Sequence, residues 1–122
     1  HTIVVFPTPS FQRNEPSDPR VSAARQWLVE NYSIDENPGL GAQGMFYYYH
    51  TMAKALTVLG EDILVLPDGT KVAWREQLAK RLFDLQDSKG FWVNENGRWW
   101  EKDPVLVSCY ALLTLERLYH TL

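Results

Sequence analysis

The sequence predicts an all-α fold made of two helical hairpins with short β-hairpin insertions. Three observations support this prediction. An amphipathic segment followed by an apolar one occurs twice along the chain, and turns rich in glycine or proline separate the segments. The two halves also match at a fixed offset, because Gly39 and Gly90 of the two interhelical loops lie 51 residues apart. An offset of this size is typical of helical-hairpin repeats.

The chain begins with a segment that has no helical period. Residues 1–17 contain three prolines among polar residues, so we expect an extended leader there. A first helix is expected over 18–32, because Asp18 is a good N-cap and Pro19 fits the first helical position. Apolar residues follow at helical spacing: Val21, Ala24, Leu28 and Tyr32.

The second predicted helix, 45–59, is apolar or aromatic on almost every side, so we expect it to be buried on most of them. Gly60 stands where a glycine commonly ends a helix. After it, the apolar run 63–66, the turn Pro67-Asp68-Gly69 and Lys71-Val72 predict a small β-hairpin that connects the two repeats.

The second repeat follows the same plan. Residues 73–87 form an amphipathic pattern that predicts an outward-facing helix, and 105–115 form an apolar helix that begins at Asp103-Pro104 and should be buried. Between them, Asn96-Gly97 separates two aromatic runs and predicts a second short hairpin. Within the helical segment 18–122, repeat one therefore spans 18–60 and repeat two spans 73–120.

A spaced motif joins the third and fourth helices. Gln86, Gly90 and Trp92 form the pattern Gln-x-x-x-Gly-x-Trp. Gln86 can satisfy backbone groups at a helix end, Gly90 permits a turn with positive φ, and Trp92 can wedge between hairpins. The first repeat is degenerate, because Tyr32 lies near the position of Gln86 and Gly41 stands in place of Trp92.

This motif, with the apolar segment 103–113 after it, resembles the QW repeat of squalene-hopene cyclases and protein prenyltransferases. In that superfamily, outer amphipathic and inner apolar helices alternate in an α/α toroid. The resemblance covers about 18–120 and implies a partial α/α toroid, since this chain supplies two hairpins. The exposed faces of the inner helices would then need the remainder of a parent protein or self-association through the inner helices.

Composition excludes several classes of function. The formal net charge is −3, and no run of Lys and Arg is present, which argues against nucleic-acid binding. No apolar run reaches the roughly 18 residues of a membrane span. Cys109 is the only cysteine, so no internal disulfide can form, and the cellular location stays open.

Aromatic residues provide the candidate site. The second helix opens with several of them, and together with Trp99 and Trp100 they can line a pocket for a hydrophobic ligand or stabilise a cation through their ring faces. Aromatic stripes also pack ordinary cores, and Asp103 also suits helix capping. The candidate pocket consists of Tyr47, Tyr48, His50, Trp99, Trp100 and Asp103.

The sequence assigns no catalytic, metal-binding or cofactor-binding residue. The acidic DxDD motif of hopene cyclases is absent, as are the motifs of thioester, hydrolase and nucleotide chemistry. The setting of His50 resembles a zinc ligand of prenyltransferase β subunits, but a zinc site would need Asp103 and Cys109 beside it.

Three functions follow from the resemblance. The first is a non-catalytic scaffold or binding surface in a squalene-cyclase/prenyltransferase-like repeat protein. The second is a part of a terpene cyclase whose catalytic acid lies outside this chain. The third is peptide or protein recognition by concave aromatic walls.

Overall fold

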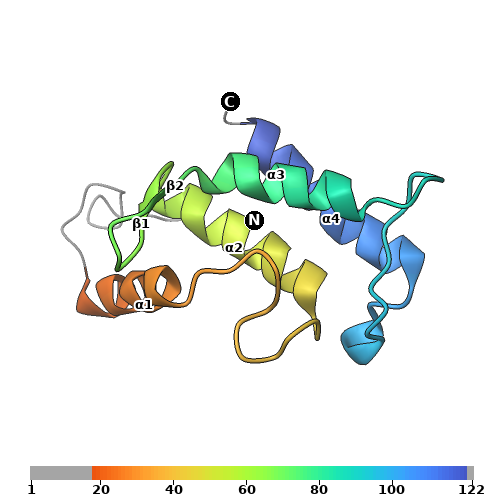
Figure 1. The fold of residues 1–122 in the computed structure, drawn as a ribbon, viewed down its shortest axis with the longest axis horizontal. Coiled ribbons are helices and arrows are strands. Elements are labelled where there is room, and N and C mark those ends of the chain that lie inside the picture. The colour runs from red at the N-terminus through yellow and green to blue at the C-terminus, as the bar shows by residue number, and fades with distance from the viewer. Residues whose placement is uncertain (1–17, 121–122) are drawn as a thin grey trace.

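The structure, a computed structural model, describes residues 18–120 (Figure 1). The predicted leader, 1–17, lies outside the described residues. Four helices and one small two-stranded sheet confirm the all-α class. In chain order the elements are α1 (Pro19–Glu30), α2 (Met45–Leu59), β1 (Leu64–Val65), β2 (Lys71–Val72), α3 (Trp74–Leu85), the short 3-10 turn η3 (Arg98–Trp100) and α4 (Pro104–His120).

Local signals set most of the element bounds. The Asp18 carboxylate accepts the Arg20 N–H at 2.8 Å and starts α1, which ends two residues before the predicted boundary. Gly60, at φ 75°, ends α2 in the left-handed conformation that a glycine tolerates. The predicted connector hairpin is present as β1 and β2, antiparallel with Leu64 opposite Val72.

The core lies where the inner helices α2 and α4 pack against each other, with α3 against α4. In Figure 1, α2 runs between α1 and α3. Each helix turns one apolar face inward because its buried residues recur at helical spacing. The largest fully buried apolar or aromatic side chains are Phe46, Tyr49, Leu56, Leu64, Trp74, Leu78, Leu82, Val107 and Leu118.

The prediction that the apolar helices are buried on most sides was wrong. Val58 of α2 is 63% exposed, and Val105, Leu112 and Leu113 of α4 are also exposed. The physical reason is the number of neighbours, because the described helices leave part of the surface of α2 and of α4 without a packing partner. Apolar faces of both helices therefore remain open to solvent.

The second predicted hairpin, around Asn96-Gly97, was also wrong. The Asn96 N–H bonds to the side-chain oxygen of Asn94, and the Arg98 N–H bonds to that of Asn96, each at 3.0 Å. These side chains occupy backbone groups that a strand ladder would use. The chain then enters η3, with φ values of 62° and 66° at Trp99 and Trp100 that no strand permits.

The motif residues act as a joint between α3, the following loop and α4. Trp92 is buried, its indole N–H donates to the Leu82 carbonyl at 2.7 Å, and its backbone N–H donates to the Ser108 hydroxyl at 3.0 Å. The Gln86 amide donates to the carbonyl of Gly90, whose φ is 102°. Gln86 therefore closes the loop that follows the helix.

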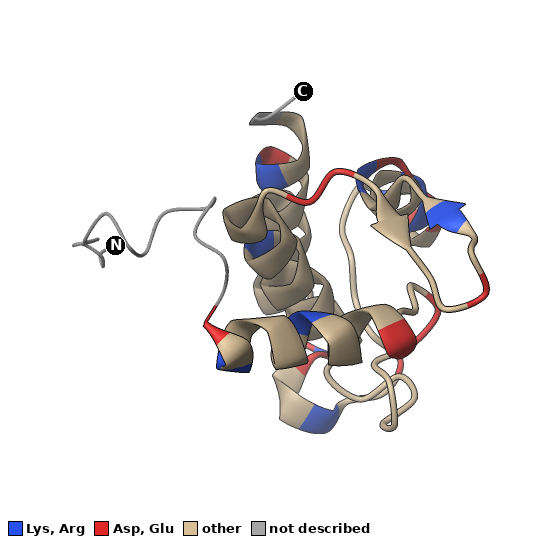
Figure 2. Ribbon diagram, turned by 90° about the vertical axis from the view of Figure 1, so that its left-hand side faces the viewer, with Lys and Arg blue, Asp and Glu red and all other residues tan. Residues whose placement is uncertain are grey.

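The described residues show no segregation of basic from acidic positions, as expected from a sequence without a run of Lys and Arg. Figure 2 shows basic and acidic positions interspersed along the described ribbon. Among residues 18–120, no helix combines the length and apolar character that crossing a membrane requires.

Candidate functional site

The two interhelical loops meet at the start of α2. We call residues 31–44 loop one and residues 86–103 loop two. The Asn94 amide of loop two donates to the Ala42 carbonyl of loop one at 2.6 Å. The Trp99 ring lies so close to Gly44 that a Cβ added there would meet Trp99 Cδ1 at 3.3 Å. Gly44 also has a φ of 60°, so a glycine is favoured here both by the close approach of Trp99 and by the left-handed backbone.

A buried carboxylate fixes this meeting point. Glu101 is 0% exposed and accepts the backbone N–H groups of Phe46 at 3.1 Å and Tyr47 at 2.8 Å. The Asn94 amide donates to the same carboxylate at 2.9 Å. Because the N-cap residue Gly44 has no side chain, Glu101, which lies 55 residues after Phe46, caps α2 instead. No local sequence pattern predicts this role of Glu101, and its one signal is the glycine at the N-cap.

An open cavity of about 500 Å³ lies above this anchor, and we call it the aromatic pocket. Four aromatic side chains form its walls, with Trp99 60% and Trp100 80% exposed. The rings of Tyr47 and Tyr110 meet edge to face at 5.7 Å between centroids. The lining residues are Asn37, Leu40, Gly44, Tyr47, Trp99, Trp100 and Tyr110.

The backbone that carries the two tryptophans is strained. Both have left-handed φ values, which cost a bulky residue on the order of 1–3 kcal/mol each. The Arg98 guanidinium lies over the Trp99 ring at 5.1 Å and covers one of its faces. The strained turn and this contact hold the indoles at the rim of the aromatic pocket.

The structure brings three of the six predicted pocket residues together: Tyr47, Trp99 and Trp100. Tyr48 points to loop one, where its hydroxyl donates to the Ser33 carbonyl at 2.9 Å and where burial raises the pKa of the phenol to about 12. Asp103 accepts the Val105 N–H at 2.9 Å and caps α4. Tyr110, which the sequence analysis did not select, completes the walls, since it lies six residues into α4 and faces α2.

His50 adjoins the aromatic pocket through Tyr110. Their rings stack at 6.1 Å between centroids, and His50 Nδ1 is buried with no hydrogen-bond partner in the described chain. Burial lowers the pKa of the imidazole, and the charges of Lys54 and Arg117 lower it further. The neutral ring therefore acts as a packing surface at neutral pH.

Within residues 18–120, no group of three His, Cys, Asp or Glu side chains is placed to hold a metal ion. Cys109 is exposed on α4, and the Asp103 carboxylate is engaged as a cap. The alternative of a zinc site at His50, Asp103 and Cys109 therefore gains no support from the side-chain placement.

The groups that the aromatic pocket offers to a ligand are ring faces and a few polar edges. No carboxylate is among its lining residues, and the carboxylates of Glu101 and Asp103 in loop two accept backbone N–H groups. In the described part of the chain, no hydrogen bond engages the hydroxyls of Tyr47 and Tyr110, so both remain available.

No family model, curated protein or solved structure matches the chain.

Proposed function

We propose that this chain is a segment of a squalene-cyclase/prenyltransferase-like repeat protein and serves as a non-catalytic binding surface. Its aromatic pocket binds the apolar part of a small ligand. The observation that carries the proposal is the open cavity of about 500 Å³ between four aromatic side chains, two of them held on left-handed backbone.

The chemistry of the walls favours an apolar ligand with at most one polar end. Covering apolar ring surface is worth about 25 cal/mol per Å² removed from water. The free hydroxyls of Tyr47 and Tyr110 suit a single alcohol or ether oxygen at one end of such a ligand. An unsaturated hydrocarbon chain ending in a hydroxyl combines both features.

The occupied carboxylates favour binding over catalysis. General acid chemistry needs a carboxyl that is free to give up a proton, whereas Glu101 accepts three N–H groups. The terpene-cyclase alternative depends on an acid supplied from outside this chain. Aromatic faces stabilise a carbocation as well as they bind an apolar ligand. The binding and the terpene-cyclase functions therefore require the same pocket walls, and they differ in whether a catalytic acid is present.

Indole N–H resonances in two-dimensional NMR test the proposal, because the five tryptophans report on different sites. Geraniol, an isoprenoid alcohol, should shift the Trp99 and Trp100 signals in a saturable way. Trp74 and Trp92, whose N–H groups are bonded to the carbonyls of Glu61 and Leu82, should stay in place. Trp27, half exposed on α1 and outside the aromatic pocket, serves as the exposed control.

Tyr47→Ala should weaken geraniol binding about tenfold or more, because it removes one wall and one hydroxyl. If Trp27 shifts as much as Trp99, or if Tyr47→Ala binds geraniol like the wild type, the assignment of the aromatic pocket is wrong. A quaternary ammonium analogue of geraniol that binds more tightly than the alcohol would favour the cation-stabilising alternative.

A further inference from the structure

Each of the two hairpins carries an apolar groove between its outer and its inner helix. The α1–α2 groove, of about 550 Å³, has apolar walls formed by Val21, Ala24, Leu28, Ala55, Val58 and Leu59. The α3–α4 groove, of about 390 Å³, has an apolar centre formed by Ala79, Phe83, Leu118 and Tyr119. Neither groove belongs to the aromatic pocket, and each lies between an outer and an inner helix.

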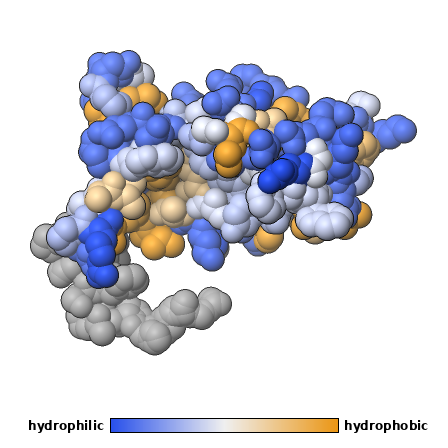
Figure 3. All heavy atoms as spheres, turned by 90° about the horizontal axis from the view of Figure 1, so that it is seen from below, coloured by the Kyte–Doolittle hydropathy of each residue, from blue (hydrophilic) through white to orange (hydrophobic). Residues whose placement is uncertain are grey.

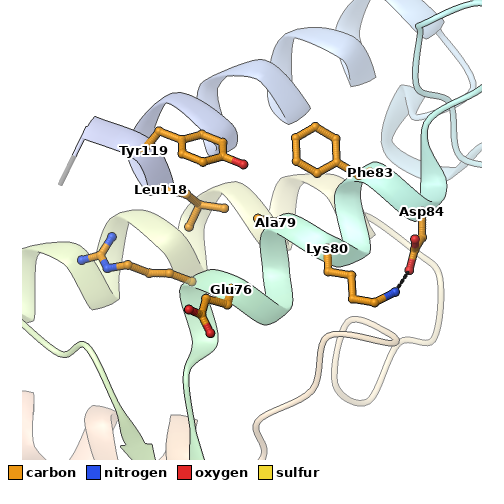
Figure 4. Close-up of a pocket in the computed structure, with 8 residues that line it drawn as sticks. Glu76, Ala79, Lys80, Phe83, Asp84, Leu118 and Tyr119 are labelled. Atoms are coloured by element: carbon orange, nitrogen blue, oxygen red, sulfur yellow. Dashed lines mark hydrogen bonds and ion pairs between the residues drawn. The ribbon is translucent and has the colours of Figure 1, made fainter. Parts of the chain in front are cut away.

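Figure 4 shows the α3–α4 groove from its open side. Phe83 of α3 and Tyr119 of α4 project toward each other over Leu118 and Ala79. Both aromatic side chains are about half exposed, so a partner that buried them would gain free energy from the apolar surface removed from water. Leu112 lies seven residues before Tyr119, on the same side of α4, and extends the apolar edge by two helical turns.

This edge faces away from the existing contact between the hairpins. Tyr110 meets α2, and Leu112 is two residues, or about 200°, further around α4. The α4 helix thus packs against α2 and α3, while its side with Leu112 and Tyr119 stays exposed. The α1–α2 groove is the corresponding open flank of the first hairpin, and Figure 3 shows apolar surface beside the described start of the chain.

Ion pairs within the chain leave one charged side chain on each groove, and the two are opposite in sign. On the α1–α2 groove, Arg20 pairs with Asp18 and Arg25 with Glu61, which leaves Lys54. On the α3–α4 groove, Arg75 pairs with Asp62 and Lys80 with Asp84, which leaves Glu76. Within residues 18–120, no ion pair engages Lys54 on the first groove or Glu76 on the second.

We infer that the chain associates head to tail with a second copy of itself, the α1–α2 groove of one copy seated on the α3–α4 groove of the next. This arrangement continues the packing that the two hairpins already make inside one chain. It buries Val58 against the region of Phe83 and Tyr119 and brings Lys54 toward Glu76 of the other copy. The inference goes beyond the proposed ligand binding and does not depend on it.

Sedimentation velocity of the full 122-residue chain tests the inference with two variants, Val58→Glu and Phe83→Glu. Each places a charge in one groove and leaves the other intact. The wild type should grow in mass with concentration, and each variant alone should sediment as a monomer. An equimolar mixture should form dimers and nothing larger, because one intact groove remains on each partner.

Other results would overturn the inference. A wild type that is monomeric at every concentration means that the grooves do not bind each other. If residues 1–17 cover the α1–α2 groove, the wild type is monomeric and Val58→Glu lowers its stability. If the pairing is symmetric through one groove, one of the two variants still dimerises and the mixture gains nothing.

Two controls separate association from misfolding and from unspecific charge effects. Ile63→Glu places the same charge at an exposed position outside both grooves and should associate like the wild type. All variants should keep the helical circular dichroism of the wild type. Lys54→Glu and Glu76→Lys should each raise the dissociation constant about tenfold, and the double variant should recover to within about threefold of the wild type.

Discussion

Loop one and loop two contain the same hydrogen-bonded turn, 50 residues apart. The offset is one residue shorter than the 51 expected from Gly39 and Gly90, because Leu40 occupies the position of Gly90 in the turn. In loop one, the Asn37 N–H donates to the Gly41 carbonyl, and the Leu40 N–H donates back to Asn37. In loop two, the Asp87 N–H donates to Phe91, and the Gly90 N–H donates back to Asp87. All four bonds measure 2.8 Å, so the turn is alike in both loops although their sequences have diverged.

The two loops differ in which side chains hold them. Loop two is anchored by its own side chains. Trp92 donates to a carbonyl of α3, Asn94 donates to a carbonyl of loop one, and Glu101 accepts a backbone N–H of α2. Loop one is held from outside. Tyr48 and Tyr49 of α2 donate to its carbonyls at Ser33 and Ile34, and Arg81 of α3 donates to Ile34 as well.

This difference explains why the Gln-x-x-x-Gly-x-Trp residues occur in one repeat only. Loop two organises the junction, and loop one needs only carbonyls that tyrosines from α2 can reach. The residues that define the aromatic pocket follow the same division, because loop two supplies both tryptophans and loop one supplies Asn37, Leu40 and Gly44.

The largest effect on this comparison is expected from Trp92→Ala. The change opens a cavity and leaves the Leu82 carbonyl without its indole donor. Removal of a buried tryptophan side chain costs about 3–5 kcal/mol, so the free energy of unfolding in denaturant should fall by that amount. Trp99→Ala is the matched control in the same loop. If Trp92→Ala lowers the free energy of unfolding no more than Trp99→Ala, whose side chain is exposed, then Trp92 does not anchor loop two.

A smaller effect is expected from Glu101→Ala, which removes the cap of α2. The buried N–H groups of Phe46 and Tyr47 would lose their acceptor, so we expect a loss of about 2–3 kcal/mol in denaturant unfolding. Glu95→Ala, at an exposed position of the same loop, should change stability by less than about 0.5 kcal/mol. Equal losses in the two variants would contradict the capping role.

The smallest effect concerns loop one at alkaline pH. Burial raises the pKa of Tyr48 from 10.0 to about 12, so the folded state keeps a proton that the unfolded state releases. This contribution to stability is complete below pH 10 and is lost as pH rises toward about 12. The free energy of unfolding should therefore fall across this interval, and it should fall less in Tyr48→Phe.

The Trp92 and Asn94 side chains that hold loop two carry no titratable group. An alkaline slope that Tyr48→Phe leaves unchanged would show that Tyr48 is not the source of the pH dependence.

The sequence predicted the elements whose signals are local. Asp18-Pro19, Gly60 and Asp103-Pro104 act on backbone groups within a few residues of themselves, and the structure has helix ends at all three. Helical spacing of apolar residues likewise predicted which elements are helices. The Asn96-Gly97 hairpin failed because side-chain bonds from Asn94 and Asn96 outweighed a turn propensity.

The candidate site was predicted in part for the same reason. Runs of aromatic residues indicated Tyr47, Trp99 and Trp100 as pocket residues. No local pattern shows that Tyr110 joins them, or that Tyr48 points to loop one instead. The sequence by itself determined the helices and the joint at Gln86, Gly90 and Trp92. Only the tertiary structure decided that Glu101 caps α2 and that the inner helices stay half open, because both depend on neighbours distant along the chain.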